Sequence, residues 1–187
     1  MAGTRIPPKI SPAYLENAAL HYLERFAASS ASLRRVLMRK IERSLAHWGG
    51  ERGEHALMLD AVMTKLVRLG YVDDQAYAGM KTRSLHRQGK GSRAIRATLA
   101  AKGIGGELAE QALQSLSDEH DEPDLAAAIR LARKRRLGPF RPNDDRPQNR
   151  AKDLSALARA GFDFDTARRV IEADSPDSLE EMLDQSC

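Results

Sequence analysis

The fold of this chain is decided at "LVRLGYVDDQAY", residues 66–77, where one helix is expected to end and the next to begin. Leu66 fits the last turn of a helix, and Gly70 fits the position just past its end, where glycine adopts a positive φ at little cost. Asp73 and Asp74 follow, and carboxylates favour helix starts because they accept backbone N–H bonds there and complement the helix dipole. The stretch therefore predicts a helix–glycine–helix junction.

The same pattern occurs twice more, as "LAAKGIGGELAE" at 99–110 and "LARAGFDFDTAR" at 157–168. In each stretch a leucine is followed four residues later by glycine and then by an apolar residue, with an alanine five residues further on. The small alanine lets the next helix come close. Three matches favour repeated helical hairpins, and the alternative is chance similarity among Ala- and Leu-rich helices.

The composition indicates an all-α protein. Aromatic residues make up 5% of the 187 residues and charged residues 30%, with a mean hydropathy of -0.51, so the core is expected to consist of small and aliphatic side chains. The chain contains no apolar stretch long enough for a membrane helix, and its N-terminus lacks the apolar region of a signal peptide. Its one cysteine, Cys187, has no internal partner, and a cytoplasmic location is expected.

Apolar residues at helical spacing predict nine helices, which group into three-helix repeats. The expected helices are 12–28, one capped by Ser30 or Ser32, 54–69, 74–87, one capped by Ser92, 106–116, 123–136, 150–160 and 165–173, with a short helix after Pro176. The expected repeats are 13–69, 70–121 and 122–175, between tails at 1–12 and 176–187. Segments 47–54 and 138–150 are expected to be long exposed loops. Together these elements predict an elongated helical array.

Charge alternates along the chain in blocks. Basic residues outnumber acidic ones by seven to two in residues 73–104 and by nine to two in residues 126–152. Acidic residues predominate by seven to none in residues 105–125 and by nine to three in residues 153–187. Such basic blocks are typical of proteins with an anionic partner. The alternative is solvated helix faces that balance one another.

Eight basic side chains are candidates for binding such a partner, because helical geometry points them away from the predicted core. None has an acidic residue three or four positions away, so local salt bridges do not explain them. They are Arg83, Arg87, Lys90, Arg93, Arg96, Arg130, Arg133 and Lys134. The alternative interpretation is again a solvated surface.

No catalytic, metal or cofactor site is expected. Asp73 and Asp74 lack the pocket and the polar neighbours that an acid–base pair needs, so they are interpreted as helix caps. The five histidines have no metal-ligand spacing: His21, His47, His55, His86 and His120. "GKGS" at 89–92 has neither the spacing nor the preceding strand of a phosphate-binding loop.

The central stretch resembles the RecX family of bacterial recombination regulators. "GYVDDQAYAGMKTRSLHRQGKGSRAIRATLAAKGIGGELAEQAL", 70–113, is similar to the family's Gly-Tyr-x-Asp-Asp block, its Gly-x-x-x-Ile-x-x-x-Leu helix and its Lys-Gly-Ile step, in that order. "SSASLRRVLMRK", 29–40, and "LARAGFDFDTARRVI", 157–171, resemble the family's first and closing segments. The chain departs from the family after Lys40, where a glycine is usual.

This resemblance implies three tandem three-helix repeats in a curved array, and a regulatory protein rather than an enzyme, with no cofactor. The implied partner is the RecA nucleoprotein filament, with inhibition of RecA and effects on DNA recombination, DNA repair and the SOS response. Weak binding to single- or double-stranded DNA, no membrane association and a monomer are also expected. Two alternatives remain open: a DNA-binding protein without a specific RecA role, and an unrelated helical scaffold.

Overall fold

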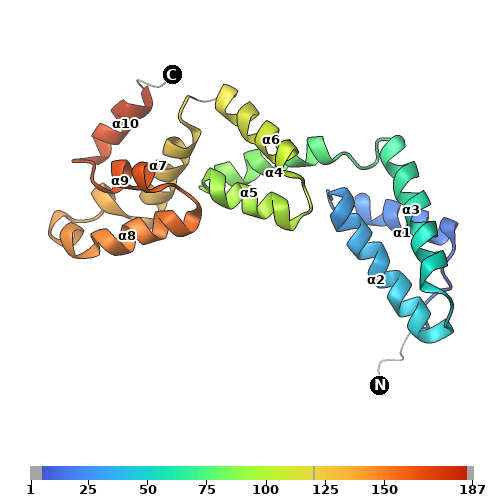
Figure 1. Ribbon diagram of the computed structural model, residues 1–187. Helices are drawn as coiled ribbons and strands as arrows, with labels where there is room; N and C mark the ends of the chain where they lie inside the picture. Colours follow the sequence, from blue (N-terminus) through green and yellow to red (C-terminus); the bar gives the residue numbers. More distant parts are fainter. Residues whose placement is uncertain (1–5, 120, 185–187) are drawn as a thin grey trace. The chain divides into compact units, whose positions relative to one another are not determined.

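The computed structural model describes residues 6–119 and 121–184, and within these ranges the chain is helical and contains no strand (Figure 1). This confirms the all-α class. The α-helices are α1 (Pro12–Leu23), α2 (Ser30–Trp48), α3 (Arg52–Arg68), α4 (Asp74–Arg87), α5 (Ser92–Ala101), α6 (Gly106–Glu119), α7 (Pro123–Arg135), α8 (Arg146–Ala160), α9 (Phe164–Ile171) and α10 (Pro176–Asp184). Two 3₁₀ turns, η1 (Gly138–Phe140) and η2 (Asn143–Asp145), lie between α7 and α8.

The described residues form two compact units. Residues up to Tyr77, together with Lys102–Ile104, form the first unit, and Ala78–Ala101 with the residues from Gly105 onward form the second. This division falls within α4, whereas the sequence predicts boundaries between helices. The division into three repeats therefore stays a prediction.

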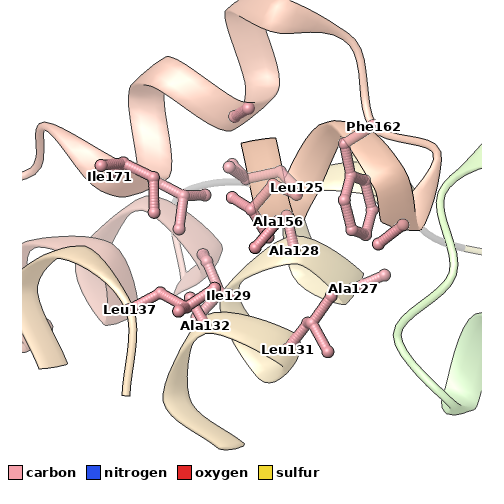
Figure 2. Close-up of a cluster of buried hydrophobic side chains, with 14 of the residues drawn as sticks. Leu125, Ala127, Ala128, Ile129, Leu131, Ala132, Leu137, Ala156, Phe162 and Ile171 are labelled. Atoms are coloured by element: carbon pink, nitrogen blue, oxygen red, sulfur yellow. The ribbon is translucent and has the colours of Figure 1, made fainter. Parts of the chain in front are cut away.

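Each unit has a core of small and aliphatic side chains, as the composition predicts. In the first unit, leucines and isoleucine of α1, α2 and α3 are fully buried; they include Leu15, Leu33, Leu37, Ile41 and Leu59. In the second, residues of α7, α8 and α9 form a buried cluster that includes Phe162, which follows α8 (Figure 2). Burial of such side chains is the main term that stabilises each unit.

The predicted glycine stops are present. Gly70, Gly103 and Gly161 have φ values of 75°, 78° and 98°. At the end of α3, the N–H of Gly70 donates to the carbonyl of Val67 at 2.9 Å, and the N–H of Tyr71 donates to the carbonyl of Leu66 at 3.0 Å. Gly161 and Phe162 repeat this pair of bonds past α8. The bonds satisfy carbonyls that a helix end leaves without partners, and the positive φ they need explains the glycines.

Asp73 and Asp74 are helix caps, but they cap different helices. Asp73 accepts the N–H of Ala76 at 2.9 Å, and so caps α4 as expected. Asp74 accepts the N–H of Ser30, the first residue of α2, at 2.7 Å. The predicted side-chain cap of α2 is also shifted, because Ser29, rather than Ser30 or Ser32, accepts the N–H of Ser32. A single sequence does not show which helix start a carboxylate faces.

The start of α5 is also capped by a carboxylate from another helix, in this case α7. The N–H of Ser92 donates to both oxygens of Asp124 in α7, at 3.0 and 3.2 Å. The N–H groups of Gly91 and Arg93 donate to the carbonyls of Ala160 and Gly161 at the end of α8. Ser92 is thus the first helical residue and not the expected cap.

The first turns of α2 and α5 are each packed against the end of another helix in a similar way. The residues that follow α5 pack on the start of α2, where Ser29 Oγ donates to the carbonyl of Lys102 at 2.5 Å. A Cβ on Gly103 would collide with Ala31, just as one on Gly161 would collide with Ala94. This recurrence supports the repeat hypothesis.

Both predicted long loops are shorter than expected. Segment 47–54 contains only a short break, because α2 continues to Trp48 and α3 begins at Arg52. In segment 138–150 the two 3₁₀ turns precede α8, and Gly138 and Pro139 are buried. The polar anchor for this segment is buried Asp153, which no local pattern in the sequence reveals.

Asp153 holds the segment through its carboxylate. It accepts the N–H of Gly138 at 2.9 Å and two bonds from the guanidinium of Arg141, each 2.8 Å long. Burial alone would raise the pKa of Asp153, but the bonds from Arg141 and Gly138 lower the pKa below its ordinary value. The ion pair therefore stays charged in the folded protein.

Candidate basic binding surface

The predicted basic residues cluster first at the turn between α4 and α5. The N–H of Gly89 donates to the backbone carbonyl of His86 at 2.9 Å, and the N–H of Lys90 donates to the carbonyl of Leu85 at 3.1 Å. Gly89 has a φ of 76°. These are the bonds of a glycine-terminated helix end, and they reverse the chain within four residues. As a result Arg87, Lys90 and Arg93 flank one tight turn in the second unit.

Helix α7 supports this turn. A Cβ on Gly89 would lie 3.1 Å from the Cβ of Leu131, so the turn packs directly on α7. The ring of His86 is buried, and its Nε2 lies 2.7 Å from the carbonyl oxygen of Pro123. A carbonyl only accepts, so Nε2 carries a proton, and Nη2 of Arg130 lies close to both ring nitrogens, 3.2 Å from Nε2 and 3.4 Å from Nδ1.

Arg130 is therefore part of the packing between α4 and α7. Burial against the ring lowers the pKa of Arg130, although its long side chain is partly exposed. Its charge is less available to a partner than the sequence suggests.

Three other predicted binding residues form ion pairs within the second unit. Arg96 donates from Nε and Nη2 to the two oxygens of Glu110, at 2.6 and 2.9 Å. Arg83 lies 3.7 Å from Glu119. Arg133 pairs with Glu180, and its guanidinium lies 5.6 Å from the centre of the Phe140 ring. These acidic partners are distant in sequence, so charges spaced three and four residues apart do not reveal the ion pairs.

The ion pair between Arg96 and Glu110 shifts the pKa values of both residues so that each favours its charged form. The hydrogen bond to Glu110 raises the pKa of Arg96, and the bond from Arg96 lowers the pKa of Glu110. Both side chains are well exposed, so the pair contributes little to stability. It does fix the direction of the Arg96 guanidinium.

The remaining four candidates are Arg87, Lys90, Arg93 and Lys134. None of them forms an ion pair with a residue in the described ranges 6–119 and 121–184. Arg87 and Arg93 are exposed, and Lys90 is half-buried. We call Arg87, Lys90 and Arg93 the α4–α5 basic turn. Arginine side chains placed in this way can form paired, charge-assisted bonds with carboxylate or phosphate groups.

In the part of the chain that the structure describes, no three His, Cys, Asp or Glu side chains gather in a way that could hold a metal ion. No helix among the described residues is long and apolar enough to cross a membrane. What the α4–α5 basic turn offers is an exposed, anion-complementary surface on a rigid helical support.

Comparison with known proteins decides the family. The chain is 47% identical over 172 residues to the regulatory protein RecX of Myxococcus xanthus, an alignment that covers 91% of each chain. The chain belongs to the RecX family. Regulatory protein RecX of Agrobacterium fabrum is 33% identical over 162 residues, covering 84% of this chain and 82% of that protein.

The family description "RecX, second three-helix domain" matches residues 73–113. This match includes the α4–α5 basic turn, Arg83 and Arg96, and it excludes the candidates on α7. The crystal structure of RecX from Lactobacillus salivarius superposes with a TM-score of 0.64 at 24% identity, covering 93% of this chain and 97% of that one. That likeness shows a shared fold, whereas the identities to the two RecX relatives confirm the family resemblance.

Proposed function

We propose that this protein regulates the RecA recombinase by binding the RecA–DNA filament, and thereby modulates DNA recombination, DNA repair and the SOS response. The observation that carries the proposal is the 47% identity to a regulatory protein RecX across 91% of both chains. Regulation by binding, without catalysis, agrees with a surface made of exposed cations on helices.

The α4–α5 basic turn is the proposed contact with the filament. A filament of RecA on DNA presents both carboxylates and phosphates, and arginine forks pair with either group. Arg87 and Arg93 are exposed, and neither forms an ion pair with a described residue, although the charge of Arg93 helps to lower the pKa of Asp163. Arg83, Arg96 and Arg133 would have to exchange an internal carboxylate for one of the partner, so they contribute less.

The proposal is tested by titrating the protein into RecA that hydrolyses ATP on single-stranded DNA. A filament regulator should inhibit hydrolysis at ratios well below one molecule per RecA, because one bound molecule affects several neighbouring subunits. A protein that only binds DNA would instead inhibit at ratios that saturate the DNA, and excess DNA would relieve the inhibition. That second result would replace the proposed function with direct DNA binding.

A further inference from the structure

A groove in the first unit lies outside the surface described above. It is formed by α1, with the residues that follow this helix, and by α2. Its volume is about 710 Å³, which is typical of sites that hold a ligand. None of its lining residues belongs to the α4–α5 basic turn. The groove is therefore a separate candidate for binding.

One part of the lining is apolar and contains both aliphatic and aromatic side chains. Ala18 and Tyr22 lie one turn apart on α1, and Val36 contributes from α2. The rings of Tyr22 and Phe26 lie 5.2 Å apart between centroids, tilted by 40°. Phe26 is 54% exposed, so the first unit leaves much of this ring in water. A bulky apolar side chain of a partner would gain by covering it.

The rest of the lining is cationic. Arg39, Lys40 and Arg43 follow one another at helical spacing on α2, and Arg25 lines the groove just past the end of α1. None of these four cations forms an ion pair with a carboxylate among the residues that the structure describes. The Nζ of Lys40 lies 5.9 Å from the centre of the Tyr14 ring, a contact that does not neutralise its charge. The three arginines are exposed.

The groove does not compensate these charges from its own lining. Glu42 is the acidic residue of the lining, and its carboxylate lies 2.6 Å from the guanidinium of Arg52. The Nε of Arg43 donates to the carbonyl of Arg39 at 3.3 Å, which orients the guanidinium and leaves it charged. The groove thus combines uncovered apolar surface with uncompensated positive charge.

We propose that this groove docks an acidic segment of a partner protein, with a bulky apolar side chain of that segment against Phe26 and its carboxylates on Arg39 and Arg43. Charge complementarity requires an anionic occupant, and arginine forks bind carboxylates through paired bonds. Arg39 and Arg43 lie one turn apart, about 6 Å along the helix axis. Carboxylates have a similar spacing one turn apart on a helix, or two positions apart, about 6.6 Å, in an extended segment.

The apolar lining favours such a segment over a strand of nucleic acid. An apolar anchor gains by burial against Ala18, Val36 and Phe26 alike. A base would bring its polar edges against the two aliphatic side chains, where these edges lose water without gaining a hydrogen-bond partner. Among the described residues of the lining, Tyr22 supplies the only hydroxyl, and no side-chain amide is present. A protein segment therefore uses more of the groove than a nucleic-acid strand does.

The inference goes beyond the proposed function, because it adds a second docking surface, for a protein segment, in another unit of the chain. The probe is a short, fluorescein-labelled peptide of glutamates around one central phenylalanine, and its binding to the full chain is followed by anisotropy. A second probe has alanine in place of that phenylalanine and carries the same charge. The wild type should bind the phenylalanine probe at least about fivefold more tightly than the alanine probe.

Two variants test the two parts of the lining. Arg39→Gln/Arg43→Gln should weaken binding of both probes by about tenfold or more, because two charge-assisted contacts are lost. Its matched control, Arg68→Gln/Arg159→Gln, removes the same charge from exposed positions of α3 and α8 and should bind as the wild type does. Phe26→Ala should bring the affinities for the two probes within about twofold of each other, because the anchor then has no ring to contact.

Folding is checked by circular dichroism, which should show unchanged helix content because the altered side chains are exposed. The comparison of the two probes on the wild type needs no variant. It therefore decides the role of the apolar anchor even if Phe26→Ala does not fold.

Three results would overturn the inference. The first is equal affinity of the wild type for the two probes, and the second is wild-type affinity in the folded Arg39→Gln/Arg43→Gln variant. The third is an oligothymidylate that competes with the peptide and loses as much affinity in Phe26→Ala, because the groove would then be a nucleic-acid site. Absence of RecA inhibition by the wild type, by contrast, would count against the proposed function and leave this inference standing.

Discussion

Asp124→Ala tests the cap that α7 provides for α5. The Asp124 carboxylate accepts the N–H of Ser92 with both oxygens, at 3.0 and 3.2 Å. Alanine removes this acceptor and leaves the first N–H of α5 without a protein partner. Asp124 also lies in the first turn of α7, where its negative charge is favourable.

The magnitude follows from these bonds. Removing an N-terminal cap costs about 0.5–2 kcal/mol, and a hydrogen bond to a charged group contributes about 1.5–3 kcal/mol. Ser92 is half-buried, so water replaces part of the missing bond. We therefore expect Asp124→Ala to lower the free energy of unfolding by about 1–2 kcal/mol, or the melting temperature by about 2–8 °C. Asp124→Asn keeps a neutral acceptor and should cost less.

Thermal melts followed by circular dichroism measure the destabilisation, and hydrogen exchange of the Ser92 amide locates it. The matched control is Asp121→Ala, which removes the same charge from an exposed position three residues earlier. It should change stability by no more than about 0.5 kcal/mol. Equal melting of the two variants, with unchanged exchange at Ser92, would show that the carboxylate does not support α5.

Two further predictions concern backbone geometry and buried charge. Gly161→Ala forces a Cβ against Ala94 at a φ of 98°, so it should lower the free energy of unfolding by at least about 2 kcal/mol. In the control Gly105→Ala, the new Cβ enters open space. Equal unfolding midpoints of the two variants in urea would contradict this. Asp153→Asn should cost about 3 kcal/mol near neutral pH. Folding lowers the pKa of Asp153, so its contribution to stability is complete above the unfolded pKa of about 3.9 and is lost as pH falls through the native pKa. The stability difference between Asp153→Asn and the wild type should therefore close in acid. A stability difference independent of pH would refute the buried ion pair as its cause.

Local physics made much of the fold predictable from the sequence. Helix α4 has the bounds expected for it, because Gly70 and Asp73 act within a few residues of the helix start that they define. The glycine stops were predictable for the same reason. Asp74 and Asp124 were not fully predictable, because a carboxylate at one helix start can cap another helix that only the tertiary structure brings near.

The candidate surface was predictable only in part. Charge blocks and helical spacing locate the cations, but they do not show which ones the folded chain neutralises. Arg96 and Arg133 pair with Glu110 and Glu180, acidic residues that lie 14 and 47 positions away.

The central claim is tested most directly by inhibition of RecA ATPase with a variant of the α4–α5 basic turn. Arg87→Glu/Arg93→Glu is preferred over changes at Arg83 or Arg96, whose charges are already paired. The control, Arg68→Glu/Arg159→Glu, alters net charge equally at exposed positions of α3 and α8.

Both variants should keep the helix content and nearly the melting temperature of the wild type, since exposed charges usually change stability by less than about 0.5 kcal/mol. The account predicts that the α4–α5 variant needs about tenfold more protein for half-inhibition, equivalent to about 1.4 kcal/mol of binding, while the control inhibits as the wild type does. A folded Arg87→Glu/Arg93→Glu variant that inhibits RecA at wild-type concentrations would contradict it.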